Sequence, residues 1–113
     1  MREMERLPKM RQYVLGVYRR PTRAPSLSDA ELDVLQEGHL AHLRGLRESG
    51  SLIVYGPVES PEIVGILVFS FDSTEEARRV MEGDPKLRAG LLQLELSEWY
   101  AAEGLEIRPT VQG

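Results

Sequence analysis

The sequence predicts an α+β protein with a ferredoxin-like fold, in which two helices cover one face of a four-stranded antiparallel sheet. Three observations support this prediction. The 113 residues are close to the commonest length of a single domain. Strand-like and helix-like hydrophobic patterns follow one another in the order β-α-β-β-α-β. Right-handed crossovers turn that order most simply into an antiparallel sheet with both helices on one side.

The composition excludes several classes of protein. Without cysteine, the chain has no disulfides, thiolate metal sites or cysteine nucleophiles. A net charge of −4 has the wrong sign for binding phosphate backbones, so we expect no nucleic-acid partner. No apolar run approaches the ~20 residues that cross a membrane. The charged N-terminus lacks the apolar stretch of a signal peptide, which predicts a cytoplasmic protein without a membrane association.

The first half of the domain is predicted to form a strand, a loop and a long helix. Residues 12–18 are apolar at nearly every position, as in a strand covered on both faces. Two prolines within residues 19–27 break any strand there and predict a loop. Ser28 and Glu31 form a capping-box pattern. A helix should therefore run from about residue 29 to about residue 49.

The second half is predicted from turn and capping signals between apolar runs. Ser73 and Glu76 repeat the capping pattern, while Asp84 before Pro85 is typical of an N-cap followed by proline at the first helical position. Four elements are expected: strands over residues 52–55 and 64–71, a short helix after Ser73 with one extra turn after Asp84, and a strand over residues 92–96.

The chain divides into one domain with two short ends. We expect a lead-in over residues 1–11, the ferredoxin-like domain over residues 12–100, and a tail over residues 101–113 in which Leu105-Glu106-Ile107 can add a short edge strand. Two helices cover only one face of the sheet, yet the first and third strands are apolar on both. The uncovered face predicts a homodimer in which two open sheet faces pack together.

His39 is the leading candidate for a catalytic group. It lies on the apolar stripe of the long helix, between Leu35 and Leu43, where a core side chain is expected. A half-buried histidine with one polar partner can move protons near neutral pH, although a buried histidine is more often only structural. His42 follows three positions later, but no further acid completes a metal-ligand set, so no metal is expected.

Asp84, Arg19 and Arg20 each allow two interpretations. Capping alone explains Asp84, and a catalytic role requires contact with His39, which spacing cannot establish. The arginines, together with Arg23, can clamp a substrate anion or remain solvated in their loop.

The sequence lacks two common motifs of enzymes. The glycines form no phosphate-binding pattern, so no nucleotide cofactor is expected. No serine lies in a nucleophile elbow.

Three short segments in a fixed order resemble the YciI-like (YCII-related) family. A Gly-His-Leu-Ala helix motif lies within residues 36–41, and residues 50–57 end in Gly56-Pro57. Residues 83–90 carry an Asp-Pro turn that ends in Ala-Gly, and Glu-Trp-Tyr follows at residues 98–100. The resemblance covers about residues 13–100.

This resemblance implies a dimeric α+β barrel, similar to muconolactone isomerase, with His39 and Asp84 in the active site. It also implies that Gly56 and Pro57 line the pocket, and that the protein acts on small molecules without a bound cofactor. Lys86 departs from the family pattern, because other branches carry a tyrosine after Asp-Pro. The loop after Arg20 also lacks the glycine expected before its proline.

Two functions follow as hypotheses from different classes. The first is a small cofactor-independent isomerase or lyase in which His39 transfers a proton and Asp84 orients its ring. The second is a non-catalytic dimer that binds a small ligand or another protein, since one fold hosts both kinds of function. Cofactor-free oxygenation is a third hypothesis, with no sequence feature of its own. Contact between His39 and Asp84 discriminates the first two.

Overall fold

The computed structural model of the chain describes residues 9–102. The described part contains one antiparallel sheet with the strand order β2-β3-β1-β4, which is the order of a ferredoxin-like fold. Its elements are β1 (Met10–Arg19), α2 (Asp29–Glu48), β2 (Leu52–Pro57), β3 (Ile63–Phe69), α3 (Thr74–Met81), α4 (Pro85–Arg88) and β4 (Gln93–Ala102). The predicted α+β class and element order are confirmed.

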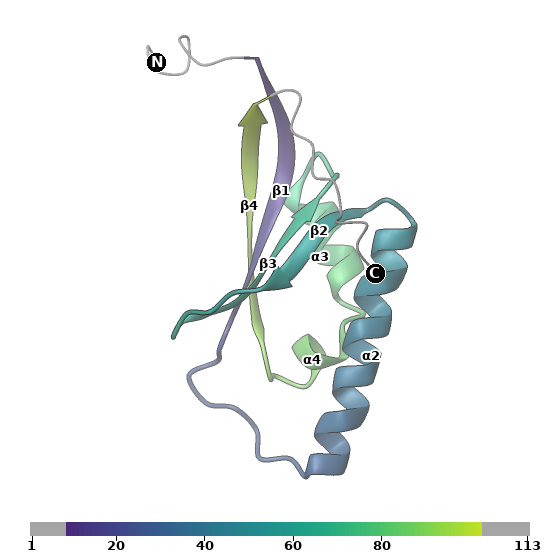
Figure 1. Ribbon diagram of the computed structural model, residues 1–113, viewed down its shortest axis with the longest axis vertical. Coiled ribbons are helices and arrows are strands. Elements are labelled where there is room, and N and C mark those ends of the chain that lie inside the picture. Colours follow the sequence, from purple (N-terminus) through teal and green to yellow (C-terminus); the bar gives the residue numbers. More distant parts are fainter. Residues whose placement is uncertain (1–8, 103–113) are drawn as a thin grey trace, which may run out of the picture.

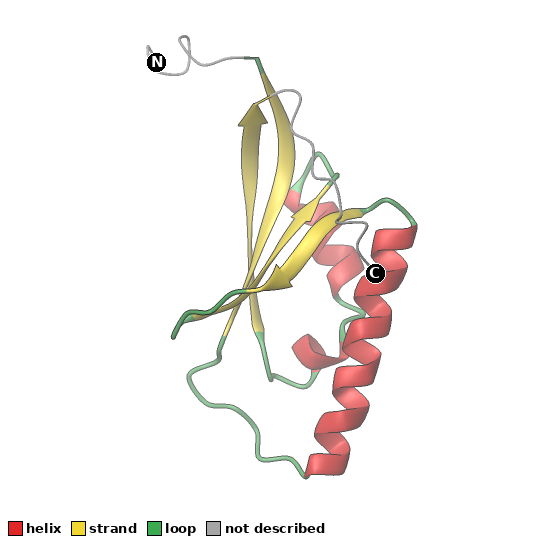
Figure 2. Cartoon of the chain, in the orientation of Figure 1, coloured by secondary structure: helices red, strands yellow, loops and turns green. Residues whose placement is uncertain are grey.

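All three helices lie on the same side of the sheet (Figures 1 and 2). Alternation along β1 explains how the core forms beneath them. Val14 and Tyr18 point toward the helices and are buried, whereas Leu15 and Val17 lie on the opposite face and stay half-buried. β4 packs against this core only through partly buried side chains, Leu94 and Leu96. The buried core comes from the other strands, α2 and α3: Val14, Tyr18, Leu43, Leu52, Leu67, Phe69, Ala77 and Met81.

Only the second half of α2 packs into this core. Its first turns extend past the end of the sheet, as Figure 1 shows. The apolar stripe predicted along the whole helix is therefore uneven: Leu32 is 37% exposed, whereas His39 and Leu43 are buried. No helix of residues 9–102 is long and apolar enough to cross a membrane.

The first and last strands of the chain are longer than predicted. β1 begins at Met10, and β4 continues to Ala102, so that the two strands pair over ten residues. Within β4 the leucine alternation stops at Leu96. Ser97 and Glu98 interrupt it, and the residues that follow pair through their backbone without continuing the pattern. The edge strand considered at residues 105–107 lies outside the described residues.

The start of α2 is fixed by the predicted capping box. The Ser28 hydroxyl accepts the Glu31 backbone N–H at 3.1 Å, and the Glu31 carboxylate accepts the Ser28 N–H at 2.9 Å. We expect Ser28→Ala to lower the free energy of unfolding by about 1 kcal/mol, the usual loss for an N-cap hydroxyl. Urea denaturation measures it, with Ser26→Ala in the preceding loop as the matched control. Equal effects of the two changes would contradict this assignment of the cap.

Candidate active site

His39 and Asp84 meet in the interior although they are 45 positions apart. His39 lies in the middle of α2 and is 8% exposed, and Asp84 precedes α4 and is fully buried. The His39 Nδ1 atom lies 2.9 Å from Oδ1 and 3.0 Å from Oδ2 of Asp84. Both oxygens of one carboxylate thus face a single imidazole nitrogen, the contact that the catalytic hypothesis requires.

Local sequence explains why the carboxylate is held there. Asp84 is the N-cap of α4, where its Oδ1 accepts the Lys86 backbone N–H at 3.0 Å and Pro85 occupies the first helical turn. Gly38, beside His39, allows α2 to approach this turn, because a Cβ there would lie 2.9 Å from Pro85 Cγ. Capping and histidine contact are therefore compatible roles of Asp84.

Tyr18 is a third member of this cluster, and the sequence did not identify it. Its hydroxyl donates a hydrogen bond of 2.6 Å to Asp84 Oδ2. Its ring centroid lies 5.5 Å from that of His39. The sequence did offer one signal for it. Tyr18 lies in a strand predicted to be covered on both faces, and a buried tyrosine hydroxyl needs a hydrogen-bond partner. The Tyr18 hydroxyl therefore helps to hold the Asp84 carboxylate in place.

The hydrogen bonds determine the charge of the cluster. Burial opposes ionisation of Asp84, but donors from His39 and Tyr18, the positive charge of a protonated His39 and the Lys86 backbone N–H outweigh it, so the pKa of this carboxyl is lowered. Burial, with the hydrogen bond to Asp84 and its negative charge, raises the pKa of Tyr18 far above its ordinary value. Asp84 is therefore a carboxylate and Tyr18 a permanent donor near neutral pH.

This arrangement orients the imidazole. A carboxylate accepts only, so Nδ1 of His39 donates its proton to Asp84 and the neutral ring carries a lone pair on Nε2. Among residues 9–102, Nε2 has no hydrogen-bond partner. His39 also lines a pocket, so a molecule bound there would lie against its ring.

The pocket at His39 has a volume of about 340 Å³ and opens between α2, β2 and β3. Its walls are mostly apolar, with Leu40 and Leu43 from α2 and Leu67 from β3. Gly56 and Pro57 lie in the wall contributed by β2, at the position that the resemblance implied. Polar atoms come from side chains spread around it: Tyr18, Gln36, His39, Tyr55 and Lys86. An apolar pocket with few polar groups is typical of a small-molecule site.

The structure does not bring Arg19 and Arg20 to this pocket. The Arg19 Nε donates to the Glu95 carboxylate at 2.6 Å. The Arg20 Nη1 donates to the backbone carbonyls of Ser60 and Pro61 at 3.1 and 3.0 Å. Both side chains thus connect the end of β1 to neighbouring segments, and their substrate-binding role stays a prediction.

His42 has a contact of its own. Its Nε2 lies 2.8 Å from the Val80 carbonyl oxygen, to which it donates, and its ring packs on Gly83, where a Cβ would lie 2.8 Å from Cε1. The residue therefore ties α2 to α3. Within residues 9–102, no three His, Asp or Glu side chains gather as a possible metal site.

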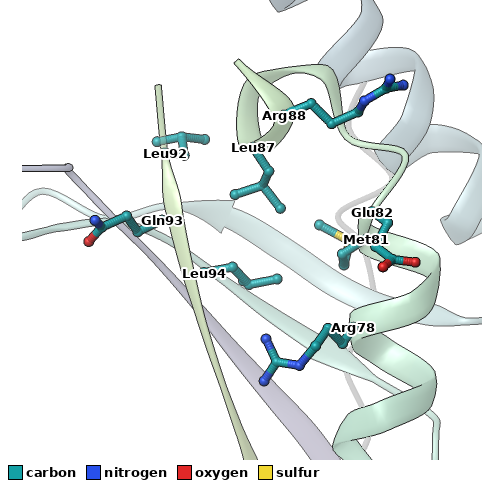
Figure 3. A pocket seen from close by; sticks show the side chains of 8 residues that line it. All are labelled: Arg78, Met81, Glu82, Leu87, Arg88, Leu92, Gln93 and Leu94. Carbon is teal, nitrogen blue, oxygen red and sulfur yellow. The ribbon is translucent and has the colours of Figure 1, made fainter. Parts of the chain in front are cut away.

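A larger hollow of about 470 Å³ lies elsewhere, between α3, α4 and β4 (Figure 3). Arg78 and Arg88 stand at its edges and point away from each other, with leucines between them. It shares Leu92 with the His39 pocket, but no histidine lines it. The proton-transfer groups therefore identify the His39 pocket as the candidate active site.

Comparison with known proteins agrees with this architecture. The solved structure of the 5-chloro-2-hydroxyhydroquinone dehydrochlorinase TftG from Burkholderia phenoliruptrix AC1100, in complex with 2,5-dihydroxybenzoquinone, is similar to this chain with a TM-score of 0.51. The two share 22% sequence identity over 76% of this chain and 92% of that one, which shows a common fold. A search among curated proteins gives no match. The family model of the YCII-related domain matches residues 11–100, and the chain therefore belongs to the YCII-related domain family.

Proposed function

We propose that the protein is a cofactor-independent enzyme of the isomerase or lyase type, which transfers a proton on a small organic molecule. The observation that carries the proposal is the direct contact of His39 Nδ1 with both oxygens of buried Asp84. A carboxylate behind the imidazole fixes its tautomer and stabilises the imidazolium that forms when Nε2 accepts a proton. A purely structural histidine does not require its other nitrogen to be left without a partner, as Nε2 is among residues 9–102.

The proposed step starts with removal of a carbon-bound proton by His39 Nε2. The electron pair of the broken C–H bond moves into an adjacent carbonyl group and forms an enolate. In an isomerase, the proton returns to another carbon of the same molecule. In a lyase, the carbonyl re-forms and the enolate pair makes a new C=C bond while a leaving group departs from the neighbouring carbon with its bonding pair; the imidazolium then gives its proton to that group or to water. The name of TftG, a dehydrochlorinase, describes loss of HCl, which is also a reaction of the lyase type.

The experiment is a search for solvent hydrogen exchange. The protein is incubated in D₂O with small cyclic ketones, lactones and 5-chloro-2-hydroxyhydroquinone, and NMR records deuterium incorporation while an electrode records chloride. We expect turnover of at least one compound, and His39→Ala should reduce its rate by about 10²-fold or more. Added imidazole should restore part of that rate, which a structural role would not explain.

A non-catalytic binding function would be recognised by measuring the melting temperature with the same compounds. A compound that raises the melting temperature of the protein, with no exchange, isomerisation or chloride release from any compound, would favour a non-catalytic binding module. Ligand binding at 100 times the dissociation constant adds about 2.7 kcal/mol to stability, so such binding is measurable.

We also propose that the protein is a homodimer that packs through the face of the sheet opposite the helices. In residues 9–102 no helix covers this face (Figure 1). Its centre carries Leu15 and Val17 from β1 beside Ile66 and Val68 from β3. Light scattering should give twice the chain mass of 12.8 kDa at micromolar concentration. A single-chain mass would contradict the proposal.

A further inference from the structure

The walls of the His39 pocket carry an unbalanced charge. Among the described residues that line the pocket, Lys86 is the only lysine or arginine, and no aspartate or glutamate is present. The negative charge of Asp84 lies behind this wall, where His39, Tyr18 and a backbone N–H already donate to it. A bound molecule therefore meets one lysine in a wall that has no acidic side chain among the described residues.

The Lys86 side chain has no partner of its own in the described part of the chain. Its backbone N–H donates to Asp84, but its ammonium makes no hydrogen bond or ion pair with residues 9–102. The residue is half-buried. A lysine can lay its aliphatic stem along an apolar wall and keep its ammonium at the opening. At such a partly buried position a charge pair is stronger than in bulk water.

The backbone of Lys86 is also held beside the proposed base. Its backbone nitrogen and the His39 ring contact the same Asp84 oxygen, Oδ1, at 3.0 and 2.9 Å. The chemistry of the proposed step needs such a group, because the negative charge that forms on proton removal collects on a substrate oxygen. A cation placed where that charge develops lowers the barrier.

From these observations we propose that Lys86 binds an oxygen of the substrate that is anionic or becomes so, and selects small molecules with an apolar body and a carboxylate, phenolate or enolate oxygen. This inference rests on the proposed function, since it names the substrate class of the same pocket. Leu40, Leu43 and Leu67 contact the apolar body, while His39 faces the carbon from which the proton is removed.

Binding of two matched probes tests the proposal without turnover. 4-Hydroxybenzoate and its neutral amide, 4-hydroxybenzamide, are titrated by NMR into the wild type, Lys86→Gln and Arg88→Gln. Arg88 is the matched control, since it is a cation of the same short helix that does not line the His39 pocket. We expect the wild type to bind the acid more tightly than the amide. Lys86→Gln should lower the affinity for the acid about tenfold and leave the affinity for the amide unchanged, as for loss of one charge-assisted hydrogen bond.

A conservative variant and the control decide the remaining outcomes. Lys86→Arg should keep the preference for the acid, which shows that the charge matters and not the length of the side chain. If Lys86→Gln and Arg88→Gln lower the affinity for the acid equally, the effect is one of general charge and the proposal is overturned. An unchanged affinity of Lys86→Gln for the acid would overturn it too. Selective binding without deuterium exchange in any compound would instead overturn the proposed function and leave the Lys86 site standing.

Discussion

Replacing Asp84 by Asn is expected to slow proton transfer by about 10⁴-fold, the loss seen when the carboxylate behind a catalytic histidine becomes an amide. The Asn amide group would donate to Nδ1 of His39, so the ring proton would move to Nε2. The nitrogen that faces the substrate would then be unable to accept a proton. Asparagine caps helices as well as aspartate, so α4 should keep its start.

The rate is measured in the deuterium-exchange assay, once a compound that turns over is known. Asp84→Asn should change kcat much more than KM, because the carboxylate touches His39 and not the substrate. Circular dichroism and the melting temperature verify that the variant is folded. A rate within tenfold of the wild type would mean that Asp84 acts only as the cap of α4.

Tyr18→Phe should lower the free energy of unfolding by about 1.5–3 kcal/mol at pH 7, as expected for a hydrogen bond to a charged group. The change removes the 2.6 Å donor from a fully buried carboxylate and leaves the ring in place. Tyr13→Phe on the same strand is the matched control, because the Tyr13 ring lies on the opposite face against Trp99. Urea denaturation of the three proteins measures both effects.

The decrease in the free energy of unfolding caused by Tyr18→Phe should become smaller at low pH. The pKa of Asp84 is lowered in the folded protein, so its stabilising contribution is present above the ordinary aspartate pKa of about 3.9 and is lost as the pH falls through the folded value. The difference between wild type and Tyr18→Phe should therefore shrink below about pH 4. A difference that is independent of pH, or equal to that of Tyr13→Phe, would contradict a charge-assisted bond.

The parts of the fold that sequence predicts well are those with local causes. The capping box at Ser28 and the Asp84-Pro85 turn lie where predicted, because the bonds that define them span two or three residues. The end of β4 is not predicted from sequence because its second half is held by backbone pairing with β1, and Ser97 and Glu98 interrupt the hydrophobic alternation before it.

The candidate site was only partly predictable because it depends on contacts between distant residues. His39 stood out as a polar residue on an apolar stripe, but spacing could not show that Asp84 reaches it across 45 positions, and the family resemblance supplied that pairing. Tyr18 was hidden because an aromatic residue in an apolar strand is typical of the core. Arg19 was weighed as a substrate ligand, whereas its pairing with Glu95 depends on the register of β1 against β4.

The most direct test of the His39–Asp84 pair is the protonation of each imidazole nitrogen. NMR of the protein labelled with ¹⁵N-histidine, at a pH where the His39 ring is neutral, distinguishes the two tautomers. The structure predicts a proton on Nδ1 and none on Nε2 in the wild type, and the reverse in Asp84→Asn. A wild-type His39 with its proton on Nε2 would contradict the account, because Nε2 is the proposed base and could not then accept a proton.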